Sequence, residues 1–199
     1  MSCKETAAPD AEGWILMQKR GQFGNPVDYF GKTFAEYEAG FGSVLKEHWI
    51  GLAKLASLTN EAKWDLKVTL VDWEGGKYTA LFHNFRVGYG PTYELEIGEY
   101  NSGASNIDQV VFSFHNMQAF SSKDRDQDAL NGSCSRLAGQ GGWWYKNCYS
   151  SNLNGLNIQT SYIKADPNSS NTNGITTIDR QKKITSYKET KMEIRKLKL

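Results

Sequence analysis

The sequence lacks both a long apolar run and a strong excess of one charge. A membrane-spanning helix needs about 20 mostly apolar residues. No stretch of the 199 residues approaches that length, and the start of the chain lacks the apolar core of a secretory leader. The 23 basic and 22 acidic side chains leave a formal net charge of +1, whereas nucleic-acid binding needs a concentrated basic surface. We therefore expect a soluble globular protein with no nucleic-acid or membrane partner.

Histidine is also scarce, and its distribution argues against an active site. His48, His83 and His115 are far apart in the sequence, so no pair has the short spacing typical of a zinc site. The sequence has neither the G-x-S-x-G turn of many hydrolases nor a G-x-x-x-x-G-K phosphate loop. We expect structural or exposed roles for these histidines and no enzymatic activity.

The cysteines indicate an oxidising compartment. Cys134 and Cys148 are 14 residues apart, and a disulfide that closes such a loop stabilises a fold by about 3 kcal/mol on the chain-entropy model. Glycosylation sequons at Asn131 and Asn168 are compatible with secretion, although such sequons are frequent by chance. We predict a secreted, extracellular protein, in which Cys3 pairs with a cysteine upstream of this sequence or in another chain.

Regular structure is predicted mainly in the first half of the chain. Residues 13–20 have the composition of a strand. A short helix follows Thr33 as N-cap, with Glu36 completing a capping box and Gly40 ending it. The amphipathic pattern of residues 47–58 predicts a second helix.

The clearest sheet signal lies in residues 64–87. Apolar residues alternate there on both sides of a Glu-Gly-Gly turn, which predicts an antiparallel hairpin. Residues 85–87 and 93–97 are expected to extend it into a central meander, and residues 191–195 alternate again as a closing strand. Gly, Ser and Asn dominate after Asn101 and predict loops. The fold class is α+β, and we find no repeat or linker that would divide the chain.

The segment 123–148 concentrates the residues that can carry chemistry. It holds alternating carboxylates at Asp124, Asp126 and Asp128, a Gly-rich stretch and the aromatic run 143–145. Calcium prefers about six to eight oxygen ligands, which carboxylates and loop carbonyls can supply. From spacing alone, a solvated acidic turn neutralised by the adjacent lysine and arginine explains the pattern equally well. An EF-hand is excluded, because Ala and Ser occupy the positions of its glycine and final glutamate.

Seven short motifs in a fixed order give the chain a family resemblance. They are Gly13-Trp14, Gly40-Phe41-Gly42, Glu47-His48-Trp49-Ile50-Gly51-Leu52, Val71-Asp72-Trp73-Glu74-Gly75, Lys123-Asp124-Arg125-Asp126, Gly142-Trp143-Trp144-Tyr145 and Ser151-Asn152-Leu153-Asn154-Gly155-Leu156. Each is weak alone, but together they make chance an unsatisfactory explanation. The chain resembles a fibrinogen-related domain, the C-terminal module of fibrinogen chains, ficolins, tachylectins, tenascins and angiopoietins.

This resemblance implies a fibrinogen C-terminal-like α+β fold. Residues 1–199 would form a single domain that lacks the N-terminal segment of the family. Its N-terminal part would cover about residues 12–60 and its central antiparallel sheet residues 61–110. Residues 111–199 would form a loop-rich part with calcium, the ligand pocket and the closing strand.

The resemblance also implies a calcium site in the aspartate-rich loop. Counted back from the first cysteine of the loop, the family pattern places side-chain ligands at Asp126 and Asp128 and carbonyl ligands at Leu130 and Gly132. Asp124 would order the loop instead.

A backbone feature is implied next to this site. Family members often have a cis peptide bond before the residue at Cys134, which here would be Ser133-Cys134. Because this chain has serine where the family usually has another residue, a trans bond is the alternative.

The implied ligand pocket is altered in this chain. The residues at its positions are Ser133, Cys134, Tyr145, Asn147, Tyr149 and Asn171. Tyr149 stands where acetyl-binding members have a histidine, and Thr177 stands where the family has a tryptophan. Backbone donors at Asn147 and Tyr149 remain able to hold an acetyl oxygen. Of the adjacent tryptophans, we expect Trp144 to belong to the core.

Two functions follow from the resemblance, neither of them enzymatic. The first is a secreted calcium-binding recognition module of lectin type, which binds acetylated or other glycan groups in innate immunity. The second is a protein–protein interaction domain for a receptor or matrix protein, without sugar binding, which the altered pocket favours. A structural assembly role through Cys3 is a third possibility, and we expect the full-length protein to be a homo-oligomer.

Overall fold

The computed structural model describes residues 13–158 and 173–197. Cys3, Asn168 and Asn171 lie outside these residues. The helices are α1 (Phe34–Ala39), α2 (Leu52–Glu61), the short 3-10 helix η1 (Ser102–Ala104), α3 (Val110–Ser113) and α4 (Cys134–Leu137). The strands are β1 (Ile15–Arg20), β2 (Phe41–Gly42), β3 (His48–Trp49), β4 (Trp64–Asp72), β5 (Lys77–Phe82), β6 (Arg86–Val87), β7 (Leu95–Glu96), β8 (Ser151–Asn152), β9 (Thr176–Ile178) and β10 (Ile184–Lys196). None of the helices in this part of the chain has the length and apolarity needed to cross a bilayer.

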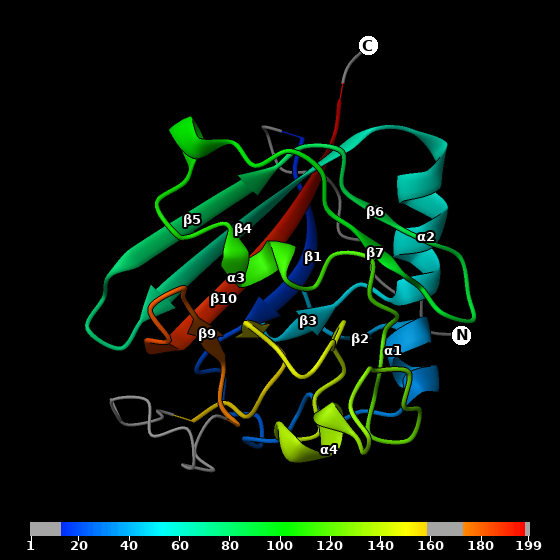
Figure 1. The fold of residues 1–199 in the computed structure, drawn as a ribbon, viewed down its shortest axis with the longest axis vertical. Helices are drawn as coiled ribbons and strands as arrows, with labels where there is room; N and C mark the ends of the chain where they lie inside the picture. Colours follow the sequence, from blue (N-terminus) through cyan, green and yellow to red (C-terminus); the bar gives the residue numbers. More distant parts are fainter. Residues whose placement is uncertain (1–12, 159–172, 198–199) are drawn as a thin grey trace.

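The C-terminal strand β10 lies in the middle of the main sheet. It pairs antiparallel with β1 on one side and with β4 on the other, in the order β2-β3-β1-β10-β4-β5 (Figure 1). Met192 and Ile194 of β10 are buried against their register partners Val68 and Leu66 of β4. The predicted hairpin and closing strand are confirmed, and the closing strand is longer than its alternating core suggested.

Helix α1 forms as the sequence predicts. The Thr33 side chain accepts a hydrogen bond from the Glu36 backbone, and the Glu36 carboxylate accepts one from the Thr33 backbone, which completes the capping box. Gly40 ends the helix at φ 84°, a backbone conformation that favours glycine. A Cβ at Gly40 would also stand 2.6 Å from the Ile50 carbonyl oxygen, so this position tolerates no side chain.

The prediction for the second helix was wrong at its start. The helix begins at Leu52, because His48 and Trp49 form β3 beside β1 instead. Gly51 turns the chain at φ 104° between the two elements. The amphipathic pattern of residues 47–58 does not distinguish a helix from a strand at Trp49, because this side chain is buried in either case.

The predicted central meander was also wrong in part. Strands β6 and β7 pair only with each other and form a separate two-stranded sheet near α2 (Figure 1). The main sheet is completed by β10 and β1, whose pairing joins residues from opposite ends of the chain and so cannot be seen in local periodicity.

An aromatic cluster connects the N-terminal part to the loop-rich part. The Phe120 ring lies 5.0 Å from Tyr37, 5.2 Å from Trp144 and 5.9 Å from Trp49. The Tyr37 hydroxyl also accepts a hydrogen bond from the Gly142 backbone at 2.9 Å. Edge-on and tilted rings of this kind add about 0.5 to 1.5 kcal/mol per pair to the burial of their area. The loops that carry the candidate site are therefore packed on a rigid base.

A buried ion pair joins β1 to the segment before β3. The Arg20 Nε atom donates to Glu47 Oε1 at 2.7 Å, and both side chains are excluded from solvent. Arg20 Nη1 also donates to the carbonyls of Leu153 at 3.2 Å and Gly155 at 2.8 Å. Burial lowers the pKa of Arg20, and the carboxylate of Glu47 opposes that shift. One guanidinium thus connects three segments that are distant in the sequence.

We predict that Glu47→Gln lowers the free energy of unfolding by about 3 kcal/mol, because it leaves a buried guanidinium without its counter-charge. Denaturant titration of the disulfide-bonded protein measures this. The matched control is Arg180→Gln, which removes the exposed Arg180–Asp108 pair and should change stability by less than about 1 kcal/mol. Equal effects of the two substitutions would contradict the prediction.

Candidate functional site

The segment 123–148 folds as a loop whose base is a short antiparallel bridge. The backbones of Ser121 and Trp143 exchange two hydrogen bonds, each 2.9 Å long. A disulfide joins Cys134 to Cys148 with their Cα atoms 5.5 Å apart, as predicted. The loop and α4 lie at the end of the molecule away from the C terminus (Figure 1).

Asp124 anchors this loop to α1. Its Oδ1 atom accepts hydrogen bonds from the Phe34 backbone at 2.8 Å and from the Ser122 hydroxyl at 2.7 Å. Burial alone would raise the pKa of Asp124, but these hydrogen bonds and the charge of Lys123 outweigh it and lower the pKa. Both carboxylate contacts are structural, which agrees with the ordering role expected for Asp124.

Asp126 and Asp128 are close to each other in the same loop. The Asp128 backbone donates to Asp126 Oδ1 at 3.2 Å. The Asp128 carboxylate accepts from the backbones of Leu130 and Cys134, both at 2.9 Å. Burial and the neighbouring Asp126 carboxyl raise the pKa of Asp128, against the lowering effect of those two hydrogen bonds.

The donor set at this position fits a hard cation. The two neighbouring carboxylates, together with the carbonyls of the turn that follows, offer only oxygen atoms. Oxygen donors are what calcium prefers. Among residues 13–158 and 173–197, no three side chains of His, Cys, Asp or Glu gather as a metal cluster. A cation here would therefore depend on backbone carbonyls in addition to the two aspartates.

The expected cis bond at Ser133-Cys134 is not found. Ser133 is the N-cap of α4, and its hydroxyl accepts from the Arg136 backbone. The Cys134 N–H is already held by Asp128, which fixes the start of that helix. The non-proline cis peptide bond in the described residues is Asn147-Cys148 instead, at the other cysteine of the same disulfide.

Unpaired backbone donors are found at this second cysteine. The N–H groups of Asn147 and Cys148 make no hydrogen bond within the residues that the structure describes. Asn147 is exposed and Cys148 half-buried. The half-buried ring of Tyr149 follows, edge-on to Tyr145 at 6.1 Å. Two polar donors and an aromatic ring thus follow one another along the chain.

Several residues predicted for the pocket are buried in the core. Tyr145 is fully buried, and its hydroxyl donates to the Gly141 carbonyl at 2.9 Å. Cys134 is also buried, and so are both tryptophans, which confirms the core assignment of Trp144. As direct ligand contacts, Tyr145 and Cys134 are contradicted by this burial. Thr177, at the position of the family's tryptophan, is buried as well and bonds to the Tyr187 hydroxyl at 2.9 Å.

His115 fixes the segment that follows Tyr149. Its Nδ1 atom lies 2.7 Å from the Trp144 carbonyl oxygen and therefore carries the proton. Its Nε2 atom accepts from the backbones of Ser150 at 3.2 Å and Ser151 at 2.9 Å. Burial lowers the pKa of His115 to about 4, so the imidazole is neutral at physiological pH. The sequence predicted a structural or exposed role for this histidine but not its partners, because no local pattern surrounds it.

Two asparagines of the S-N-L-N-G motif were also unassigned from sequence. Asn152 Nδ2 donates to the Ala138 carbonyl at 2.9 Å, and Asn154 Nδ2 donates to the Gly142 carbonyl at 2.8 Å. Both side chains are buried. They connect the two sides of the loop-rich part, which explains why amides are needed at alternate positions.

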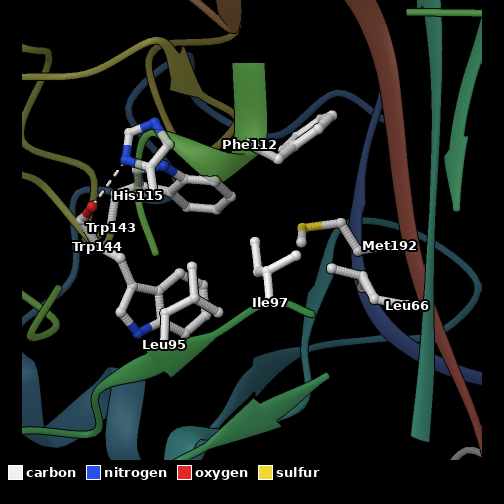
Figure 2. Close-up of a pocket in the computed structure, with 8 residues that line it drawn as sticks. All are labelled: Leu66, Leu95, Ile97, Phe112, His115, Trp143, Trp144 and Met192. Atoms are coloured by element: carbon white, nitrogen blue, oxygen red, sulfur yellow. Dashed lines mark hydrogen bonds between the residues drawn. The ribbon is translucent and has the colours of Figure 1, made fainter. Parts of the chain in front are cut away.

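A small internal cavity of about 10 Å³ lies beside His115, but it is not a ligand site (Figure 2). Its lining residues are Leu66, Leu95, Ile97, Phe112, His115, Trp143, Trp144 and Met192. Figure 2 shows the imidazole turned toward the Trp144 carbonyl, with apolar side chains across the gap. Such a volume holds about one water at most, so the cavity is a packing gap of the core.

We predict that the free energy of unfolding falls as the pH is lowered from about 6.5 to about 4. In that range the unfolded chain binds protons on His115 and His48, while the folded chain keeps both neutral because burial lowers their pKa to about 4. Denaturant titrations across this range measure the slope. His115→Gln should make the slope shallower by removing the contribution of His115. His48→Leu should likewise remove the contribution of His48. A slope unchanged in both variants would refute this explanation.

Three comparisons with known proteins agree on the family. Residues 3–197 match the profile described as fibrinogen beta and gamma chains, C-terminal globular domain. Techylectin-5A of Tachypleus tridentatus is 37% identical over 80% of this chain and 52% of its own length. Ficolin-3 of Homo sapiens is 37% identical over 72% of this chain and 46% of its own length. The chain therefore spans about half the length of these two relatives.

Solved structures give the same result for the fold. The fibrinogen-like globe domain of human ANGPTL6 matches with a TM-score of 0.79 and 32% identity, over 94% of this chain and 79% of that one. A lamprey fibrin D-dimer, complexed with the peptide Gly-His-Arg-Pro-amide, matches with a TM-score of 0.72 and 26% identity, over 94% of this chain and 63% of that one. The resemblance read from the seven motifs is confirmed: the chain belongs to the family of the fibrinogen C-terminal globular domain.

Proposed function

We propose that this chain is an extracellular recognition module that binds acetylated or other small polar groups of glycans at residues 147–149. The observation that carries the proposal is the pair of unpaired N–H groups at Asn147 and Cys148, directly before the ring of Tyr149. A relative named as a lectin, Techylectin-5A, supports the same reading. None of the relatives named above is named as an enzyme.

The backbone donors and the aromatic ring suit an acetyl group. An amide oxygen can accept from two neighbouring N–H groups, and each such hydrogen bond contributes about 0.5 to 1.5 kcal/mol. The methyl group can pack on the ring of Tyr149, as apolar ligand atoms commonly do on tyrosine. Because these contacts are few, one site is weak. Strong binding would come from several sites on a homo-oligomer, which together raise the effective concentration.

Calcium is proposed as a brace for this pocket. Asp126 and Asp128 would hold it through their carboxylates, and Leu130 and Gly132 through their carbonyls. When bound, calcium would supply positive charge that offsets the negative charge of the two aspartates. It would also fix the turn before Ser133. The chain's own contribution is the contact from Asp128 to the Cys134 backbone, which connects that turn to α4 and to the disulfide. Ligand contacts remain with the residues around Asn147.

The proposal includes a cellular location for the protein. We propose an extracellular location and a role in innate immune recognition; the Cys134–Cys148 disulfide and the family membership support the extracellular location. Asn131 is exposed, so its sequon is accessible to glycosylation.

A second candidate function is binding of a protein ligand. Leu137 of α4 is 64% exposed, four residues after Ser133, and an exposed leucine is better matched to a protein side chain than to a sugar hydroxyl. The lamprey fibrin D-dimer structure contains a bound peptide ligand. In this version, the same loops contact a receptor or matrix protein, and Leu137 belongs to the interface.

Calorimetry with calcium chloride tests the brace. We predict calcium binding to the folded protein at millimolar concentration or below, and a loss of affinity of at least about tenfold in Asp128→Asn, since outer-shell contacts alone contribute that much to metal affinity. The matched control is Asp124→Asn, which removes the same charge from a carboxylate held by Phe34 and Ser122. No binding by the unaltered protein, or equal losses in both variants, would overturn the calcium site.

A glycan array, with and without chelator, tests the pocket. We predict binding to acetylated sugars that is lost in Asn147→Pro, which removes one backbone donor, and weakened in Tyr149→Ala. Asn147→Ala keeps the donor and should still bind. Near-ultraviolet circular dichroism identifies variants that have lost the fold.

Two results on the array would count against the glycan site. One is the absence of any sugar signal, and the other is equal binding by Asn147→Pro and Asn147→Ala. Capture of a purified protein ligand that Leu137→Ala weakens and N-acetyl sugars do not compete would instead support the second function.

A further inference from the structure

The turn between the proposed carbonyl ligands contains an Asn-Gly pair, Asn131-Gly132. We propose that Asn131 is a site of spontaneous deamidation and that its conversion weakens calcium binding by the aspartate-rich loop. In this reaction the Gly132 backbone nitrogen gives its proton to a base and bonds to the side-chain carbonyl carbon of Asn131. The protonated base returns the proton to Nδ2, the bond from that carbon to Nδ2 breaks, and ammonia leaves. Water then opens the cyclic imide at either carbonyl, which gives aspartate or isoaspartate.

The surroundings of Asn131 leave this reaction unobstructed. Both residues are exposed, and the Asn131 side chain makes no hydrogen bond within the described residues. Gly132 has no Cβ to shield its nitrogen, and the space that a Cβ would occupy is open, with a methyl carbon of Leu130 3.8 Å from that position as its nearest neighbour. One restraint exists: the Gly132 N–H donates to the Leu130 carbonyl at 2.9 Å, within the same exposed turn.

The chain contains two other Asn-Gly pairs, which serve as internal comparisons. Asn154 is buried, and its amide is held by Gln18 at 3.1 Å and by the Gly142 carbonyl at 2.8 Å. The next pair, Asn173-Gly174, has a buried glycine that bridges to Leu156. In both pairs the side chain or the glycine is fixed, so the bond formation required for the imide is hindered.

The consequence follows from the position of Asn131 between Leu130 and Gly132. Isoaspartate makes the main chain one methylene longer and moves the two carbonyls relative to each other, whereas aspartate only adds a charge. The N-linked glycan expected at this sequon occupies the same Nδ2 atom, so a glycosylated molecule would be protected. The effect on calcium rests on the proposed function, while the preference for Asn131 does not.

The test is to age the folded, disulfide-bonded protein, made in a host that adds no N-linked glycans, in mildly alkaline buffer at physiological temperature. Peptide mapping by mass spectrometry then follows the three Asn-Gly pairs. We expect Asn131 to convert several-fold faster than Asn154 and Asn173, and Asn131→Gln to abolish conversion in that peptide. Conversion of Asn154 or Asn173 at the same rate, or none at Asn131, would overturn the proposal.

Calorimetry on the aged samples tests the consequence. Calcium affinity should fall in the aged protein and persist in aged Asn131→Gln, and fresh Asn131→Asp should bind better than the aged protein because its main chain is unchanged. Equal affinity of aged and fresh protein would refute the effect on calcium. If fresh protein binds no calcium, the proposed calcium site is wrong. Peptide mapping still tests whether Asn131 deamidates.

Discussion

The buried guanidinium of Arg20 is the interaction on which the arrangement of the molecule depends. A charge in the interior is costly unless its partners are fixed, and here the partners come from three places: Glu47, the carbonyls of Leu153 and Gly155, and the ring of Phe30 at 4.0 Å. Leu153 and Gly155 follow the segment that carries the candidate pocket. The position of that segment is therefore set from the N-terminal strand, through the core.

The loop-rich part is held mainly by hydrogen bonds from side chain to backbone. His115 accepts from Ser150 and Ser151, and Asn152 and Asn154 donate to carbonyls on the other side of the loop. Regular structure is not needed where buried polar side chains pair the backbone in this way. Residues that would otherwise look like mobile loop thus form a defined surface at Asn147 and Tyr149.

Local patterns predicted the elements whose causes are local. The capping box of α1 and the hairpin β4–β5 both follow from residues within a few positions of each other. The start of α2 was predicted too early because Glu47 forms an ion pair with Arg20, 27 positions earlier in the sequence. The pairing of β10 with β1 was not predicted either, because the two strands lie at opposite ends of the chain.

The candidate site was predicted only as far as the family motifs reached. They identified Asp124's separate role, but they placed the cis bond at the wrong cysteine and offered Tyr145 to the ligand although it is buried. The donors that carry the proposed function could not be read from sequence, since every residue except proline has a backbone N–H. Only the fold shows which of them lack a partner.

The central place of β10 has a consequence for how this protein is made. A ribosome delivers the chain from its N terminus, and β10 therefore emerges only after β1 and β4. Until then β1 and β4 have no strand between them, and their apolar faces stay open to solvent or to other chains. The main sheet therefore cannot be completed before β10 has emerged, and a nascent chain that stalls before residue 184 exposes surface that chaperones bind.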